Sequence, residues 1–205
     1  MSEYVSAAIG RTGNAAASTE QAQESAWIAA SRQGDPQAFN RLVLKWEKAV
    51  FNLALRMLGD REEAAEAAQD IFLSAYRNIR TFRQDARFST WLYRIAANRC
   101  ISRIRRRPPG IHISLEDERA AALPVAQLAV PEPQDAELLR FEERQRVRRA
   151  LSALPADQRA VVELKFFQDR TFEEIAAILE TPLSTIKSRL YTGLELLKDR
   201  LGARD

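Results

Sequence analysis

Apolar residues recur at helical spacing along most of this chain, and this regularity does most to limit its possible folds. The first stripe consists of Phe39, Leu42, Val43, Trp46, Val50, Leu53 and Met57. The second consists of Ala64, Ala67, Ile71, Ala75 and Ile79. Strand-like alternation is weak throughout. The pattern therefore predicts an all-α protein.

Turn residues indicate where the predicted helices begin and end. Asp35 stands before a proline, which is typical of a helix start because its carboxylate accepts from unpaired backbone N–H groups. Gly59 predicts the end of that helix. Ser89 or Thr90 is the expected cap of a later helix, which the proline at Pro108 must end.

A proline-rich acidic segment divides the chain into two helical blocks. Residues 114–137 carry six acidic residues and one arginine, and helical periodicity fades there, which predicts an extended linker. We expect two small helical domains at residues 26–108 and 138–205, joined by a linker over 109–137. A flexible tail rich in small and polar residues is expected over residues 1–25.

The composition argues against several classes of protein. The chain has one cysteine, Cys100, and one histidine, His112, so neither a disulfide framework nor a metal site is expected. It has no glycine-rich phosphate loop and no nucleophile–base pair, so we expect no enzymatic activity and no cofactor. No segment reaches the roughly 20 apolar residues that span a bilayer. With no signal-peptide pattern either, the expected location is the cytoplasm, without membrane insertion.

The stretch "TFEEIAAILETPLSTIKSRLYTGLELL" predicts a helix-turn-helix. Thr171 and Glu174 have the spacing of a capping box, and Thr181 before a proline predicts the start of the second helix. In such a motif the second helix enters the major groove. Its outward residues are expected to be Leu183, Ser184, Lys187, Ser188 and Tyr191, with Arg189 near the rim. An ordinary helical hairpin fits the periodicity equally well, and Glu180 stands where many such motifs carry glycine.

The segment "RFSTWLYRIAANRCISRIRRRPP" sets three aromatic residues ahead of six arginines, without an acidic residue. On a helical wheel one stripe holds Trp91, Arg94, Asn98, Ser102 and Arg105. The opposite stripe holds Tyr93, Ala97, Cys100 and Ile104. Cations suit phosphates and rings suit unstacked bases, so the segment favours binding of single-stranded nucleic acid. Each aromatic residue could instead pack in a core, and the arginines could merely solvate the helix.

Four blocks in this order resemble the small two-domain sigma factors of the extracytoplasmic-function (ECF) group. They are "GDPQAFNRLV", "QDIFLSAYRNIRTFR", "FSTWLYRIAANRCISRIRRR" and "LSALPADQRAVVELKFFQDRTFEEIAAILETPLSTIKSRLYTGLELL". The resemblance implies a protein that binds RNA polymerase core enzyme and promoter DNA, both as duplex and as melted strand. It also implies control by an anti-sigma factor and a stress or envelope regulon. The alternatives are a helix-turn-helix regulator that binds an operator without polymerase, and a helical interaction protein with no DNA function.

The resemblance also implies roles for individual residues. The residues matched to minus-ten recognition and melting are Phe82, Arg83, Phe88, Trp91, Arg94, Asn98, Arg105 and Arg106. Those matched to the minus-thirty-five element are Ser184, Thr185, Lys187, Ser188, Arg189 and Tyr191. Gln69, Asp70 and Ile71 match the polymerase-binding block, and Phe72 beside them is expected in the core. Thr192 stands where relatives usually carry a further base.

Overall fold

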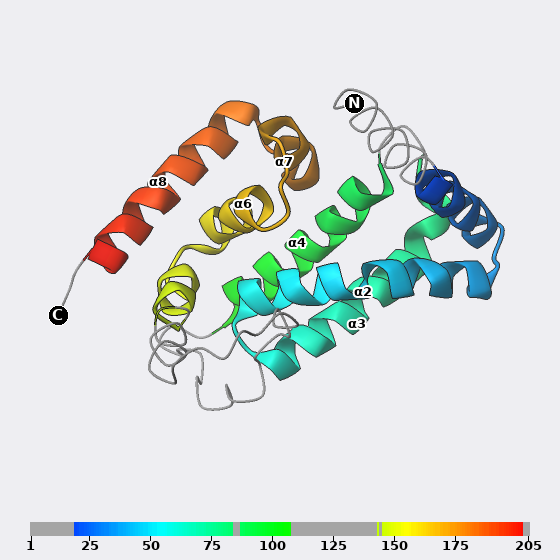
Figure 1. Ribbon diagram of the computed structural model, residues 1–205, viewed down its shortest axis with the longest axis horizontal. Helices are drawn as coiled ribbons and strands as arrows, with labels where there is room; N and C mark the ends of the chain where they lie inside the picture. Colours follow the sequence, from blue (N-terminus) through cyan, green and yellow to red (C-terminus); the bar gives the residue numbers. More distant parts are fainter. Residues whose placement is uncertain (1–18, 84–86, 108–142, 144, 203–205) are drawn as a thin grey trace, which may run out of the picture.

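The computed structural model describes residues 19–83, 87–107, 143 and 145–202, and it is helical apart from short turns (Figure 1). The N-terminal block comprises a helix over residues 19–32, α2 (Pro36–Leu58), α3 (Arg61–Asn78), the 3-10 helix η1 (Ile79–Thr81) and α4 (Phe88–Arg106). The C-terminal block comprises a helix over residues 145–152, α6 (Ala156–Phe166), α7 (Phe172–Leu179) and α8 (Leu183–Gly202). The all-α prediction is confirmed. The predicted linker lies outside the described residues.

Two of the predicted helix ends are confirmed. The Asp35 carboxylate accepts from the backbone N–H groups of Gln37 at 2.8 Å and Ala38 at 3.3 Å, which starts α2. Gly59 ends it in the left-handed region, with φ of 81°. Asp60 then caps α3 by accepting from the Glu63 N–H at 2.7 Å. These caps fix the turn that brings α3 back against α2.

Two predicted caps are wrong. α4 begins at Phe88, and Ser89 and Thr90 lie inside its first turn without capping it. The reason is the burial of Phe88, which fixes the start of the helix one residue earlier than a polar cap would. α8 begins at Leu183, and the Thr181 hydroxyl donates back to the Leu179 carbonyl at 2.9 Å. Both corrections leave the helices themselves in place.

The predicted N-terminal tail is too long. The first described helix covers residues 19–32, so it begins inside the segment that was expected to be flexible. Glu24 holds this helix to α2, because its carboxylate accepts from Trp46 Nε1 at 2.6 Å and pairs with Lys45 at 3.3 Å. Residues 1–18 lie outside the described residues.

The core of the N-terminal block lies where α2, α3 and α4 meet. The predicted stripe of α3 is buried there, and its alanines at positions 64, 67 and 75 let the neighbouring helices approach closely. Tyr93, Ala97 and Cys100 bury the predicted packing side of α4. Burial raises the pKa of the Cys100 thiol to about 12.

The C-terminal block packs directly on the N-terminal block. α6 contacts α2 and α4, and α7 contacts α4. α8 lies at the outer edge of the molecule, with α6 between it and α4 (Figure 1). Buried side chains of both blocks join in one apolar cluster. The two blocks are therefore closed on each other along α4.

Candidate nucleic-acid interface

Two arginines of α4 hold this helix to α3. Arg103 donates to Asp70 at 2.8 Å and approaches Glu66 at 3.3 Å, and the hydrogen bond to Asp70 raises the pKa of Arg103. Arg99 lies 3.9 Å from the same Asp70 carboxylate. Asp70, matched above to polymerase binding, is thus already paired within its own block. These two arginines have a structural role that their spacing did not reveal.

Two further arginines of α4 reach the C-terminal block. Arg94 donates to the Ala177 carbonyl at 2.8 Å and pairs with Glu180, also at 2.8 Å. Arg105 donates to both carboxylate oxygens of Asp157, at 2.8 and 3.0 Å. Two of the four arginines expected to face promoter DNA therefore face acidic residues of the other block in this conformation.

The rest of the predicted stripe divides into open and covered positions. Asn98, Ser102 and Arg106 are exposed, and Arg106 makes no ion pair among the described residues. Arg83, on the loop before α4, is exposed as well. Residues 84–86 of that loop lie outside the described residues. The open part of the surface thus retains a hydrogen-bonding amide and two cations.

The aromatic residues before and within α4 form one packed cluster. Phe82 and Phe88 are only 3% and 6% exposed, and their ring centroids lie 5.7 Å apart at nearly right angles. Trp91 packs against both rings, at 5.2 and 5.5 Å, and remains half-buried. Phe82 and Phe88, matched above to minus-ten recognition, are too buried in this structure to contact DNA, because neighbouring rings pack against them. Both rings pack against Trp91 and have a structural role in the N-terminal block.

A buried polar seam joins α2 and α4 to the C-terminal block. Glu163 is 3% exposed and accepts from Arg56 Nε at 2.9 and 2.8 Å. Gln168 donates to Glu163 at 3.2 Å and accepts from the Tyr93 hydroxyl at 2.6 Å. Burial raises the pKa values of Glu163 and Tyr93. The side chains of Arg56, Glu163, Gln168 and Tyr93 are linked to one another by these hydrogen bonds. The seam therefore favours one relative arrangement of the two blocks.

Arg159 completes the seam from α6. It is 4% exposed, and its guanidinium donates to the Met57 carbonyl at 2.6 Å, to Leu154 at 3.0 Å and to Ser152. Burial lowers its pKa to about 10, so it stays charged at neutral pH. Sequence reasoning missed both Arg159 and Glu163. Their partners in the N-terminal block, Met57 and Arg56, lie 102 and 107 positions away, beyond the reach of any local pattern.

α7 and α8 form the predicted helix-turn-helix. The capping box is reciprocal, with Glu174 N–H donating to the Thr171 hydroxyl at 3.1 Å and Thr171 N–H donating to Glu174 at 3.0 Å. Buried isoleucines at positions 175, 178 and 186 pack the two helices together. Glu180 occupies the turn in the left-handed region, with φ of 49°.

The outward face of α8 matches the predicted one except at Leu183, which is half-buried. Ser184, Lys187 and Ser188 are exposed, and the Tyr191 side chain is 60% exposed. Thr185 is half-buried. Arg189, also half-buried, lies 3.9 Å from Asp157. The first turns of α8 therefore present hydroxyls, an ammonium group and a phenol to solvent.

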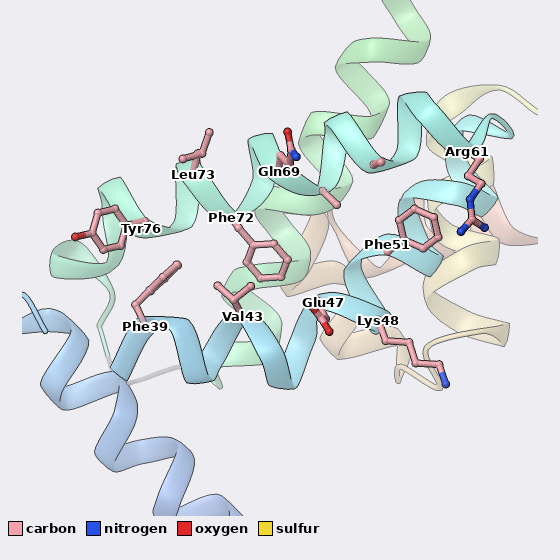
Figure 2. Close-up of a pocket in the computed structure, with 12 residues that line it drawn as sticks. Phe39, Val43, Glu47, Lys48, Phe51, Arg61, Gln69, Phe72, Leu73 and Tyr76 are labelled. Carbon is pink, nitrogen blue, oxygen red and sulfur yellow. The ribbon is translucent and has the colours of Figure 1, made fainter. Parts of the chain in front are cut away.

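An apolar groove of about 960 Å³ runs between α2 and α3, as Figure 2 shows. It is lined mainly by Phe39, Val43, Phe51, Phe72, Leu73 and Tyr76. Leu73 and Tyr76 are 53% and 46% exposed, which is unusual for large apolar side chains. The run "IFLSAY" carries apolar residues on more faces than one core can bury, and that signal could have predicted a second apolar surface.

The groove corrects two of the predictions for the polymerase-binding block. Ile71 is fully buried, so its side chain is part of the core and cannot contact a partner. Phe72, expected in the core, is half-buried and lines the groove beside Gln69. Gln69 is exposed at this rim and Asp70 is partly exposed, so both remain accessible.

Comparison with known proteins follows the same division into two blocks. The family models for sigma-70 region 2 and sigma-70 region 4 match residues 42–108 and 144–197. The chain is 35% identical over 173 residues to the ECF RNA polymerase sigma factor SigW of Bacillus subtilis (strain 168), covering 83% of this chain and 92% of that protein. The chain belongs to the ECF group of RNA polymerase sigma factors.

Solved structures resemble the fold of this ECF sigma factor. CnrH in complex with the cytosolic domain of CnrY aligns with a TM-score of 0.64 and 23% identity, over 89% of this chain and 99% of that one. The sigma factor RpoE in complex with the anti-sigma factor NepR from Bartonella quintana aligns with a TM-score of 0.58 and 24% identity, over 82% and 98%. In the part of the chain that the structure describes, no helix is long and apolar enough to cross a membrane, and no cluster of potential metal ligands occurs.

Proposed function

We propose that this ECF sigma factor binds RNA polymerase core enzyme in the cytoplasm and directs it to specific promoters, with no catalytic activity or cofactor of its own. The observation that carries the proposal is the joint match to region 2 and region 4, on two blocks that both present DNA-binding chemistry. A stand-alone operator-binding regulator has no comparable support, because it needs no region 2.

The exposed face of α8 supports duplex recognition at the minus-thirty-five element. Lys187 stands at the centre of this face, with Ser184, Ser188 and Tyr191 around it. Lysine and serine donors suit the base edges of the major groove and the phosphates beside it. We assign Thr185 and Arg189, which are both half-buried, to contacts with the DNA backbone.

The N-terminal block supplies the groups for the minus-ten element. Arg83, Asn98 and Arg106 are exposed, while Arg94 and Arg105 become available only when the C-terminal block leaves α4. Trp91 is the aromatic side chain best placed to stack on an unpaired base, since Phe82 and Phe88 are buried behind it. A flipped base costs a few kcal/mol of stacking, which such a ring partly restores.

The groove between α2 and α3 supports polymerase docking. It joins exposed apolar side chains to polar groups such as Gln69 and Glu47 in its lining, the combination of apolar centre and polar edge that is typical of protein interfaces. An anti-sigma factor that covers the same surfaces is the proposed regulator, since RpoE of Bartonella quintana was solved with one.

Run-off transcription with purified core polymerase and a library of promoter fragments tests this function. We expect promoter-specific transcripts only when the protein is present. A second test uses Leu73→Asp, which places a charge in the groove. This variant should abolish transcription while leaving the circular dichroism spectrum intact. A protein that footprints duplex DNA by itself, and never supports a transcript, would instead be an operator-binding regulator.

A further inference from the structure

Acidic residues of the C-terminal block occupy the DNA-facing arginines of α4. Glu180 pairs with Arg94 at 2.8 Å, and Asp157 pairs with Arg105 at 2.8 Å. Asp157 also lies 3.9 Å from Arg189, on the rim of the helix-turn-helix face. One carboxylate thus lies between arginines matched to the two promoter elements. Carboxylates offer guanidinium groups the same bidentate acceptors that phosphates do.

Glu180 is an unexpected residue for its position. The turn between α7 and α8 places it in the left-handed region, where glycine is favoured and a side chain is strained. Its carboxylate makes no ion pair within its own block among the described residues, and its partner is Arg94. Since the turn itself does not need a glutamate, the contact with α4 accounts for the residue better than the local fold does.

Further contacts hold α7 against α4. The Ala177 carbonyl near the end of α7 accepts from Arg94 at 2.8 Å, and the negative end of the helix favours a cation there. Arg87 lies 3.6 Å from Glu174, at the other end of α7. α7 is therefore held along the start of α4 by acceptors at both of its ends, and the Arg94 guanidinium already has acceptors where a phosphate would bind.

We propose that the C-terminal block is a built-in competitor of promoter DNA, with Glu180 and Asp157 standing in for phosphates on Arg94 and Arg105. In the closed protein Arg94 and Arg105 of the minus-ten surface are paired with these carboxylates, while α8 still faces outward. The surface becomes available when the blocks separate. This inference rests on the proposed function, because it assigns the covered arginines to promoter binding.

The design of the contact fits a reversible cover. Arg105 is 62% exposed and Glu180 is 64% exposed, so their ion pairs are solvated and screened by salt. Asp157 and Arg94 are about one-third exposed. Solvated ion pairs of this kind favour one alignment of the two surfaces but stabilise it only weakly. A binding partner that separates the blocks can therefore break these ion pairs.

Energy transfer between two dyes on the full-length chain tests closure without DNA or polymerase. Arg77→Cys on α3 and Lys198→Cys on α8 supply exposed labelling positions, and the buried thiol of Cys100 is protected. In this labelled chain the double variant Glu180→Gln/Asp157→Asn should lower the transfer efficiency. Raising the salt concentration to about 1 M should lower the transfer efficiency of the labelled chain that retains Glu180 and Asp157. The same salt should change the transfer efficiency of the double variant little.

A charge-matched control separates the contact from general electrostatics. Glu195→Gln/Asp199→Asn removes the same two charges from exposed positions of α8, outside the contact with α4. Binding of a fluorescein-labelled thymidine oligonucleotide is then measured by anisotropy for both double variants. The variant at Glu180 and Asp157 should bind roughly fivefold more tightly than the control, because apparent affinity scales with the open fraction.

The outcomes are distinct. Unchanged transfer efficiency in the Glu180→Gln/Asp157→Asn variant, with a native circular dichroism melt, would overturn the proposal. Equal DNA affinity of the two double variants would overturn it as well, since charge alone would then explain the gain. Failure of the proposed function appears elsewhere, as missing run-off transcripts from a protein whose energy transfer still responds to the variant.

Discussion

The two helices proposed to face DNA, α4 and α8, have similar chemistry and opposite surroundings. On α4, Arg94 and Arg105 pair with acidic side chains from another part of the chain. On α8, Lys187 and Tyr191 are exposed, and the Lys187 ammonium lies 5.8 Å from the centre of the Phe172 ring without an acidic partner among the described residues. The difference shows that residue type and spacing predict what a surface can bind, whereas availability is decided by what packs against it.

Position in the fold explains this difference. α4 contacts α2, α3, α6 and α7, so most of its circumference is covered, whereas α8 packs mainly on α6 and α7. A helix packed on one side keeps a free face by geometry alone. A helix packed on several sides keeps one only if a neighbour moves away. The predictions below alter one helix or its cover while leaving the other unchanged.

The largest effect is expected from Arg159→Ala, which removes a buried donor to three backbone carbonyls. The unpaired carbonyls should lower the free energy of unfolding by roughly 3 kcal/mol, measured by urea denaturation. Arg159→Lys is the control and should lose less, since it keeps the charge and one donor. A loss under about 0.5 kcal/mol for the alanine variant would mean that the seam does not hold the blocks together.

Lys187→Ala tests the open helix. If Lys187 contacts a base edge, discrimination between matched and mismatched minus-thirty-five duplexes should fall by roughly 1–3 kcal/mol in competition binding. Lys198→Ala removes the same charge from an exposed position of α8 far along the helix, and it should leave discrimination unchanged. An equal loss of affinity for all duplexes would restrict Lys187 to phosphate contacts.

Glu180→Gly separates backbone strain from the ion pair. Both Glu180→Gly and Glu180→Gln remove the carboxylate, but only glycine relaxes the left-handed turn. The glycine variant should therefore be more stable to thermal or urea unfolding than the glutamine variant by about 1 kcal/mol. Equal stability of the two variants would show that the turn tolerates a side chain without cost.

The smallest effect is expected from single arginine changes on α4. Arg106→Ala should reduce the slope of log affinity against log salt for single-stranded DNA by somewhat under one unit, because this exposed arginine can already contact phosphate. Arg105→Ala should change the slope less in the closed protein, since Asp157 occupies it. In the Glu180→Gln/Asp157→Asn background the two changes should become equal. If Arg105→Ala reduced the salt slope more than Arg106→Ala in the closed protein, Arg105 would be the more available of the two arginines and the prediction would be wrong.

Features that act over a few residues were predictable from the sequence. Asp35, Gly59 and the pair Thr171–Glu174 each act on backbone groups within four positions, and the structure confirms all of them. The buried stripes of α2 and α3 follow from periodicity in the same way. The exposed face of α8 was predictable for the same reason, since its opposite face carries a regular apolar stripe.

Features that depend on distant residues were not predictable. Arg94 meets Ala177 across 83 positions and Arg105 meets Asp157 across 52, so no local pattern could match each arginine to its acceptor. The absence of acidic residues within α4 suggested an open cationic surface, yet the neutralising groups come from other helices. Phe82 and Phe88 were misjudged for a related reason. Composition identifies a ring but not what covers its faces.

Burial of the chain's single cysteine has a consequence for signalling. Oxidants and electrophiles attack thiolates, and the Cys100 thiol is fully enclosed with a pKa of about 12, so at neutral pH it presents almost no thiolate. In the folded protein this residue is therefore unreactive toward peroxide and thiol-modifying reagents. Oxidation of Cys100 is not available as a switch of binding while the N-terminal block stays folded.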